Sequence, residues 1–496
     1  MKIFNKYINR SIVVLSGLAV ALTGCMGFLE EEVYTQYDPD SFLQDPSGVD
    51  ALLTGAYARS RIISYNHRDY AFLLNEFGTD IAWETGGGLE RVAAPFIQFS
   101  WPVNNSILNG VWNKMYSAIS SANTVLLVAN GLSGPSESEL NALRAEARFI
   151  RASSYYFLYN LFGPTPIIEI PAGATPAEIE EIGQSTPRAS KEDFLKYMFD
   201  DLDFATANLP VQEKLIGRAS KGAALGFKMK IYLNDKQWDN VAATAQEIMD
   251  LGVYTLYDDY EELFSVDGEA NKEYIFRAPC IPQDGYQNNY MAHAFPPGYP
   301  IQSSWANYGA QYRTYSAFYK TFEEADLRRN LLITNYVSTT GENIELLEDE
   351  NGMPLDNVRS FKYWPDPDGI GESHGNDLVF IRYADVLLAR AEALNELNGP
   401  SQEVFDLINS VRERANASLV GSAEYSSADQ LRAFILAERA REFYSEGMRR
   451  EDLIRHGEFV NGAISRGWNA KPHQVLYPIP LQQIDTNPNL EQNPGY

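Results

Sequence analysis

The segment GESHG, residues 371–375, matches the Gly-x-Ser-x-Gly pattern that surrounds the nucleophile of many serine hydrolases. In that pattern, the serine stands in a sharp turn between a buried strand and a helix. Here the preceding residues are YWPDPDGI, and their prolines and aspartates are not compatible with a central strand. We therefore expect Ser373 to lie in a polar loop before a helix that starts near Leu378. A surface serine hydrolase that uses this motif remains an alternative.

The histidines and cysteines are too dispersed to suggest a metal site. No two histidines have the spacing of metal ligands, and the chain contains only Cys25 and Cys280. We expect no metal site, no cofactor and no enzymatic activity. The histidines are His67, His293, His374, His456 and His473.

Aromatic residues are concentrated in the stretch GYQNNYMAHAFPPGYPIQSSWANYGAQY, residues 285–312. Its prolines and glycines interrupt regular structure, and Ser303 is a plausible helix N-cap. Tyr286, Tyr290, Trp305 and Tyr308 are therefore expected in a loop or at a helix start. Flat rings can stack on the C–H faces of sugars, and nearby Asn and Gln side chains can bind hydroxyls. From Tyr315 onward, the aromatic spacing indicates a buried helix instead.

Two other stretches offer the same chemistry. Trp83 and Trp101 flank the glycine loop TGGGLE, and Asn104 follows, while Trp364 stands in KYWPDPDG. A packing role remains the alternative for each aromatic residue. The full set of candidate ligand contacts is Trp83, Trp101, Asn104, Tyr286, Tyr290, Trp305, Tyr308 and Trp364.

The charge balance argues against binding to nucleic acid. The chain of 496 residues has 40 Lys and Arg against 66 Asp and Glu, which gives a net charge of −26. Such a chain repels phosphate backbones. Its hydrophobic content of 45% is sufficient for one large or two interlocked domains.

The N-terminus has the pattern of a lipoprotein signal peptide. Basic residues precede the uncharged run SIVVLSGLAVALTG, which is shorter than the roughly 20 residues of a membrane-spanning helix. LTGC is similar to a lipobox, in which the cysteine thiol accepts the lipid. We expect a signal peptide over residues 1–24, lipid attachment at Cys25 and an acidic tether over 25–45.

Helical periodicity dominates the rest of the chain. Arg382 and Asp385 could pair across one turn of such a helix. Several segments form helix–turn–helix units of the size found in tetratricopeptide-type solenoids, separated by irregular stretches over 83–110, 279–311 and 338–376. The expected helical segments are 140–162, 190–210, 220–235, 237–252, 377–399, 401–418, 427–447 and 449–457, with capping serines at 190 and 427.

Several motifs resemble the RagB/SusD family. They are CMGFLEEEVYTQYDP, RAEARFIRASSYYFLYNLFG, FIRYADVLLARAEALNELNG, AERAREFYSEGMRREDLIRHG and LYPIPLQQIDTNPNLEQNPGY, and they occur in the order typical of the family. One departure is YTQYDP, where the family more often has a proline soon after the acidic start.

The resemblance implies a mainly α SusD-like fold, in which tetratricopeptide-type helix pairs pack against an irregular, loop-rich half. We expect an N-terminal helical region over 46–252, interlocked with a C-terminal region over 253–496. The resemblance also implies a surface-exposed outer-membrane lipoprotein that captures glycans and delivers them to a SusC-like TonB-dependent transporter. A peptide-capturing member of the same family is a further alternative.

Overall fold

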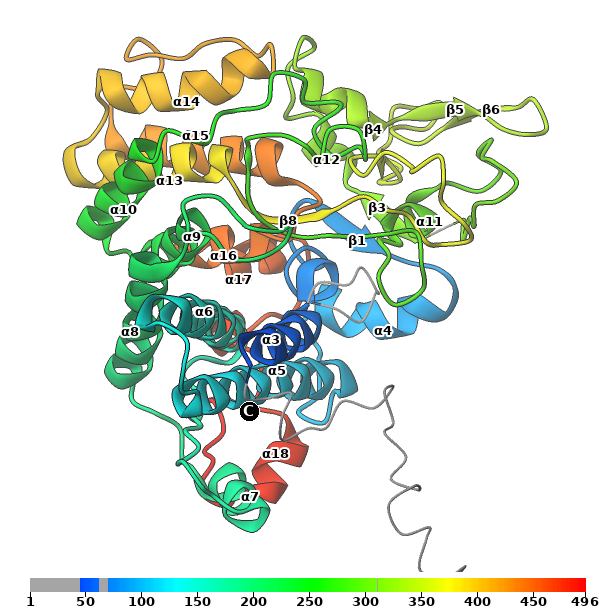
Figure 1. The fold of residues 1–496 in the computed structure, drawn as a ribbon. Coiled ribbons are helices and arrows are strands. Elements are labelled where there is room, and N and C mark those ends of the chain that lie inside the picture. The colour runs from blue at the N-terminus through cyan, green and yellow to red at the C-terminus, as the bar shows by residue number, and fades with distance from the viewer. Residues whose placement is uncertain (1–44, 62–69, 310) are drawn as a thin grey trace, which may run out of the picture. The chain divides into compact units, whose positions relative to one another are not determined.

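The structure, a computed structural model, describes residues 45–61, 70–309 and 311–496 (Figure 1). Backbone contacts divide the chain into two units, residues 1–48 and 49–496, and the fold described below is that of the second. The signal peptide, Cys25, almost all of the acidic tether and His67 therefore lie outside the described residues. In the described part, no helix is long and apolar enough to cross a bilayer.

Long helices form one part of this unit; the first seven pack in succession, each against the next, and the last packs against the sixth (Figure 1). Hence the expected mainly α fold built from helix pairs is confirmed. In chain order, these helices are α5 (Ser106–Gly131), α6 (Glu137–Phe162), α8 (Lys191–Asn208), α9 (Lys221–Asn234), α10 (Trp238–Asp250), α13 (Tyr383–Asn398), α14 (Gln402–Arg414) and α15 (Ala428–Phe443).

Side chains at the helix starts explain where these helices begin. Asn105 caps α5, and Ser136 forms a capping box with Glu139 at the start of α6. The predicted caps Ser190 and Ser427 accept hydrogen bonds from Asp193 N (3.0 Å) and Gln430 N (3.3 Å). The remaining helices are α3 (Pro46–Ser60), α7 (Pro176–Ser185), α16 (Arg449–Arg455), α17 (Glu458–Ser465), α18 (Leu481–Thr486), η1 (Tyr70–Leu74) and η3 (Pro472–Val475).

The second part is rich in loops. Short strands within it form antiparallel pairs that hold the loops together (Figure 1). The pairs are β1 with β3, β2 with β8, β4 with β7, and β5 with β6. The strands are β1 (Ala82–Glu84), β2 (Tyr274–Ala278), β3 (Tyr312–Thr314), β4 (Leu332–Ile333), β5 (Asn335–Val337), β6 (Asn343–Glu345), β7 (Arg359–Ser360) and β8 (Leu378–Arg382). Short helices lie between them: α4 (Gly87–Ile97), α11 (Tyr290–Ala294), α12 (Ser316–Tyr319) and η2 (Leu327–Leu331).

Three local predictions were wrong. The glycine loop TGGGLE leads into α4, so the stretch 83–110 is not irregular throughout. The segment from Leu378 starts as strand β8, because its residues pair with β2 before the chain turns into α13. No helix starts at Ser303, and the helix expected from Tyr315 is only the four-residue α12.

A single apolar cluster contains buried residues from both of the expected regions, 46–252 and 253–496. Phe149 and Phe227 from the first region contact Phe276 from the second, with ring centroids 4.9 and 5.9 Å away. The boundary between the two regions remains a prediction.

A network of buried ion pairs joins α15 to the loop-rich part. Arg382, at the end of β8, is completely buried and contacts the carboxylates of Glu273 (2.7 Å), Glu442 (2.5 Å) and Glu446 (2.8 Å). The predicted pairing of Arg382 with Asp385 is therefore wrong. Asp385 instead faces Arg439 (2.9 Å) and Lys230 (3.6 Å) on other helices. Arg382 and Asp385 do not share a helical turn, because Arg382 is the last residue of β8 and Asp385 lies in α13.

Glu438 and Glu442 are the acceptors at the centre of this network. Burial acts to raise the pKa of Glu438, but the nearby guanidinium groups outweigh burial and lower the pKa to about 2. The pKa of Glu442 is also lowered, because Arg414, Arg382 and Arg328 overcome the effect of burial. Both side chains are therefore carboxylates at neutral pH.

We predict that Glu442→Gln strongly destabilises the protein. The substitution leaves three buried guanidinium groups without their shared carboxylate, and removal of one member of a buried ion pair costs about 3–5 kcal/mol. Urea unfolding at pH 7 measures this loss. The matched control is Asp200→Asn, which removes an exposed carboxylate paired with Lys196 and should change stability by about 0.5 kcal/mol or less. Equal effects of the two substitutions would contradict the role assigned to the network.

Candidate functional site

The early loop and the mid-chain loop that contain most of the candidate residues lie side by side. β1 pairs with β3, and Trp83 stands opposite Arg313 in the register. Thr85 N also donates a hydrogen bond to the carbonyl oxygen of Gln311 (3.4 Å). Pairing of short strands therefore holds two segments together that are more than 200 residues apart in the sequence.

The backbone around Trp305 is fixed by a second loop, which contains the GESHG motif. Ala306 N donates to Gly371 O (2.6 Å), and Gly371 N donates to Ser304 O (2.7 Å). The indole of Trp305 stacks on Phe295, with ring centroids 5.9 Å apart and an interplanar angle of 10°. The His374 ring meets its edge at 5.6 Å. Trp305 is therefore half-buried and held in one orientation.

Tyr308 lies beside this pair of loops and remains 48% exposed. Its hydroxyl donates a hydrogen bond to Glu372 Oε2 (2.9 Å), and its backbone N donates to Ala292 O (2.9 Å). One side of its ring meets His293, with centroids 5.0 Å apart. Partial burial and then the Glu372 carboxylate raise the pKa of Tyr308, so the phenol stays protonated as a donor.

Trp364 and Ile370 extend the exposed apolar area. Trp364 is 50% exposed and packs at 6.2 Å from Phe361, which in turn contacts Phe295 beneath Trp305. Ile370 is 68% exposed and is held by backbone hydrogen bonds with Ser373. We call the group Trp305, Tyr308, Trp364, Ile370 and Glu372 the aromatic surface.

Two buried groups close to these loops, His293 and Glu84, are mainly uncharged at neutral pH. Burial lowers the pKa of His293 to about 4, although a hydrogen bond with Gln311 opposes the shift. Burial, together with the charge of Glu90, raises the pKa of Glu84 in β1 to about 8. Apolar faces with a carboxylate acceptor at Glu372 thus suit a ligand that has flat apolar patches and hydroxyl donors.

Two predicted site residues belong to the core, and their expected exposure was wrong. Trp101 is only 5% exposed because it packs against Phe99 and Tyr477 and donates its indole N–H to Tyr496 Oη (3.0 Å). Tyr290 is 4% exposed, because it begins α11, a short helix whose residues are all buried. Its hydroxyl contacts Ser445 Oγ (3.0 Å), in the loop after α15.

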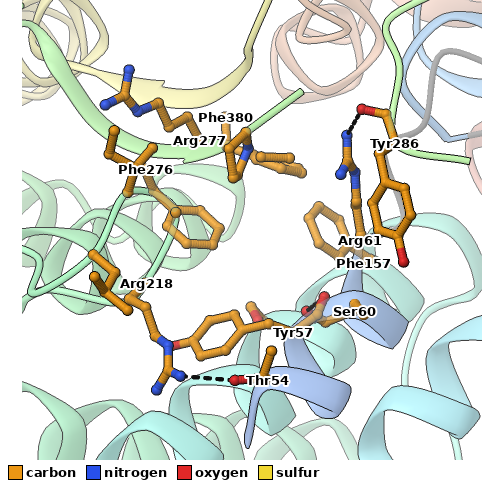
Figure 2. A pocket seen from close by; sticks show the side chains of 17 residues that line it. Thr54, Tyr57, Ser60, Arg61, Phe157, Arg218, Phe276, Arg277, Tyr286 and Phe380 are labelled. Carbon is orange, nitrogen blue, oxygen red and sulfur yellow. Dashed lines mark hydrogen bonds between the residues drawn. The ribbon is translucent and has the colours of Figure 1, made fainter. Parts of the chain in front are cut away.

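The other three candidates stand elsewhere on the molecule. Trp83 stacks on Tyr315 (6.2 Å), and its indole N–H donates to Asp356 O (2.9 Å). Asn104 is exposed in the turn before α5. Tyr286 is 48% exposed and lines a separate cavity (Figure 2).

Ser373 does not stand in a nucleophile elbow. It is buried in a loop, where its backbone pairs with Ile370, and the next regular element is strand β8 rather than a helix. The prediction of a polar loop is confirmed, whereas the helix expected directly after it is a strand.

Three residues of the site were not identified from the sequence: Ile370 and Glu372, which belong to the aromatic surface, and His374, which contacts Trp305. They lie in or directly before the GESHG motif, which we considered as a hydrolase motif or a polar loop and not as part of a binding surface. Their relation to Trp305 depends on backbone pairing between segments about 65 residues apart, and no local pattern indicates it.

We predict that Trp101→Ala destabilises the protein by about 3–5 kcal/mol, because the substitution leaves a cavity in the core. Chemical denaturation measures the change. Trp364→Ala is the matched control, since half of that side chain is already in water, and it should cost about 1 kcal/mol or less. A small loss for Trp101→Ala would mean that the loop before α5 is open.

Comparisons with known proteins agree with this architecture. The model of the SusD family matches residues 256–496, and the model described as "Starch-binding associating with outer membrane" matches residues 27–233. The SusD-like protein P25 of Formosa agariphila is 28% identical over 98% of this chain and 99% of its own length. The starch-binding protein SusD of Bacteroides thetaiotaomicron is 25% identical over 86% of this chain and 85% of its own length.

A solved structure supports the fold independently. The surface glycan-binding protein A from Bacteroides fluxus superposes with a TM-score of 0.75 at 24% identity, over 91% of this chain and 99% of that one. The matches to the family models confirm the resemblance inferred from the sequence motifs. Since family models match both halves of the chain and relatives align along most of its length, the chain belongs to the SusD family.

Proposed function

We propose that this protein binds glycans non-catalytically at the aromatic surface. The observation that carries the proposal is the group formed by the half-buried ring of Trp305 and the exposed rings of Tyr308 and Trp364, which packing and hydrogen bonds hold in fixed orientations. Similar proteins include a starch-binding protein and a surface glycan-binding protein, which supports the same class of ligand.

Pre-organisation is what makes such a surface effective. A flexible oligosaccharide loses conformational freedom when it binds, so affinity is lost if the protein must also be ordered. Phe295 fixes Trp305 from behind, and Glu372 fixes Tyr308 through its hydroxyl. These two side chains therefore lose little conformational entropy when a sugar chain stacks on their rings.

The charge of the surface favours neutral glycans. Glu372 brings a carboxylate to the ligand side, and the chain as a whole carries a charge of −26. Polyanionic sugars would approach against this field. Neutral hydroxyls, in contrast, can donate hydrogen bonds to the Glu372 carboxylate.

The expected affinity is weak. If a glycan removes a few hundred Å² of apolar surface from water, the gain is about 5 kcal/mol at roughly 25 cal/mol per Å², before the cost of ordering the sugar chain. The dissociation constant should then be on the order of 0.1 to 1 mM. We propose that this weakness allows release of the glycan to a SusC-like TonB-dependent transporter.

We predict that Trp364→Ala and Tyr308→Ala each lower glycan affinity at least tenfold, while the melting temperature changes little because both side chains are exposed. A panel of oligosaccharides from starch, β-glucan and xylan would identify a ligand, and calorimetric titration would measure the two variants. Trp305→Ala is less suitable, because the loss of its contact with Phe295 would also destabilise the loops.

Tyr286→Ala is the matched control for this titration. Tyr286 has the same exposed fraction as Tyr308 but lines a different cavity, so its loss should leave glycan affinity unchanged. If Tyr286→Ala lowers the affinity and the two variants of the aromatic surface do not, glycan binding lies elsewhere on the protein.

We also propose that the protein is a lipoprotein anchored to the outer membrane through Cys25. The sequence LTGC after an uncharged run supports this anchor, and one of the matching family models is described as associating with the outer membrane. Cys25→Ser removes the thiol that accepts the lipid, so the variant should leave the membrane fraction. Unchanged fractionation of Cys25→Ser would contradict lipid attachment at this residue.

A further inference from the structure

A cavity of about 280 Å³ lies apart from the aromatic surface and shares no residue with it (Figure 2). It is enclosed by the C-terminal half of α3, by α6, by strands β2 and β8, and by the loop 211–218. Its volume is close to the lower end of the range of small-molecule pockets and is too small for an oligosaccharide. A ligand of this cavity would therefore be a compact molecule.

Several aromatic side chains line the cavity. In β2 and in β8 every residue is buried except the central one, and these two central residues, Phe276 and Phe380, both line the cavity. Their rings lie 5.6 Å apart, and Phe157 from α6 packs 5.5 Å from Phe380. Tyr57 of α3 lies across the cavity from them (Figure 2).

The loop 211–218 reaches the cavity because of a glycine. Gly217 has a φ of +81°, and a Cβ at this position would lie 2.4 Å from Pro279 Cδ. Its close approach brings Leu215 and Ile216 to the cavity, where both remain more than half exposed. Exposed apolar side chains at the mouth of an apolar cavity suit the entry of a ligand with a hydrophobic body.

The three arginines of the cavity differ in their partners. Arg218 pairs with Asp50 (2.7 Å) and Glu146 (3.2 Å), and Arg277 pairs with Asp377 (3.1 Å). For Arg61, by contrast, the described residues provide no carboxylate within ion-pair distance. Its Nη2 donates to Tyr286 O (2.9 Å) and contacts Cys280 Sγ (3.1 Å).

Arg61 is therefore a half-buried cation that forms no ion pair with a described carboxylate; the nearby Asp377 carboxylate interacts with it electrostatically but pairs with Arg277. Its Nη1 has no hydrogen-bond partner among the described residues, and the guanidinium lies at one side of the cavity (Figure 2). Partly buried charges are usually compensated by an opposite charge. A carboxylate is the group that best matches a guanidinium, because two parallel N–H groups can face its two oxygens.

We propose that this cavity is a second binding site and that it takes a small aromatic carboxylate. The ring of the ligand would pack among Phe157, Phe276 and Phe380, and its carboxylate would pair with Arg61. This ligand differs in charge and size from the neutral glycans proposed for the aromatic surface. The two proposals therefore stand or fail separately.

Calorimetric titration with 3-phenylpropionate tests this site. Binding to the wild-type protein should be at least tenfold tighter than binding of 3-phenylpropanamide, which has the same ring but no charge. Arg61→Gln should lower the affinity for the acid at least tenfold and remove the preference over the amide. Arg59→Gln is the matched control, because Arg59 lies in the last turn of α3, two residues before Arg61, and does not line the cavity.

A second variant keeps the test independent of Arg61. Ala58 is exposed and lines the cavity, so Ala58→Trp should occupy the space without disturbing the core, and binding of the acid should be lost. No binding of 3-phenylpropionate to the wild-type protein would overturn the proposal. Equal affinity for acid and amide, or full binding by Ala58→Trp, would overturn it as well.

Discussion

The carboxylate of Glu442 forms ion pairs with arginines from three separate segments of the chain, and the packing of the loop-rich half depends on these ion pairs. Its partners are Arg328 in η2, Arg382 at the end of β8 and Arg414 in α14. All four side chains are almost completely buried, so each charge would be costly without the others. The network therefore favours a single arrangement of these segments. Short two-stranded sheets alone would not fix that arrangement, because such sheets are only marginally stable.

The same network also holds the segment that carries Trp364 of the aromatic surface. Lys362 pairs with Glu446 and donates to the carbonyl oxygens of Glu442 and Tyr444, and it stands two residues before Trp364. Tyr363, between them, donates its hydroxyl to Ser445 O (3.0 Å). The segment that presents Trp364 is thus attached to the end of α15 and the loop after it. A loop with little regular structure can in this way present rigid rings.

The helical half was largely predictable from the sequence, because period and capping residues are local signals. Ser190 and Ser427 mark helix starts through bonds that span three residues. The candidate site was predictable only in part. Trp101 was a candidate ligand contact because it flanks the glycine loop and Asn104 follows it, yet Tyr477 and Tyr496, near the C-terminus, bury it. No local pattern indicated the role of Glu442, because the arginines that pair with it come from other segments of the chain. Such contacts depend on tertiary pairing, which spacing along the chain does not encode.

Hydrogen-exchange mass spectrometry with a bound oligosaccharide would locate the glycan site without any substitution. If glycans bind at the aromatic surface, amides in residues 302–308 and 364–373 gain protection when a neutral glycan saturates the protein. Amides around Trp101 and in the loop 211–218 should not change. Protection that is confined to those latter segments, with none at residues 302–308 and 364–373, would contradict glycan binding at the aromatic surface.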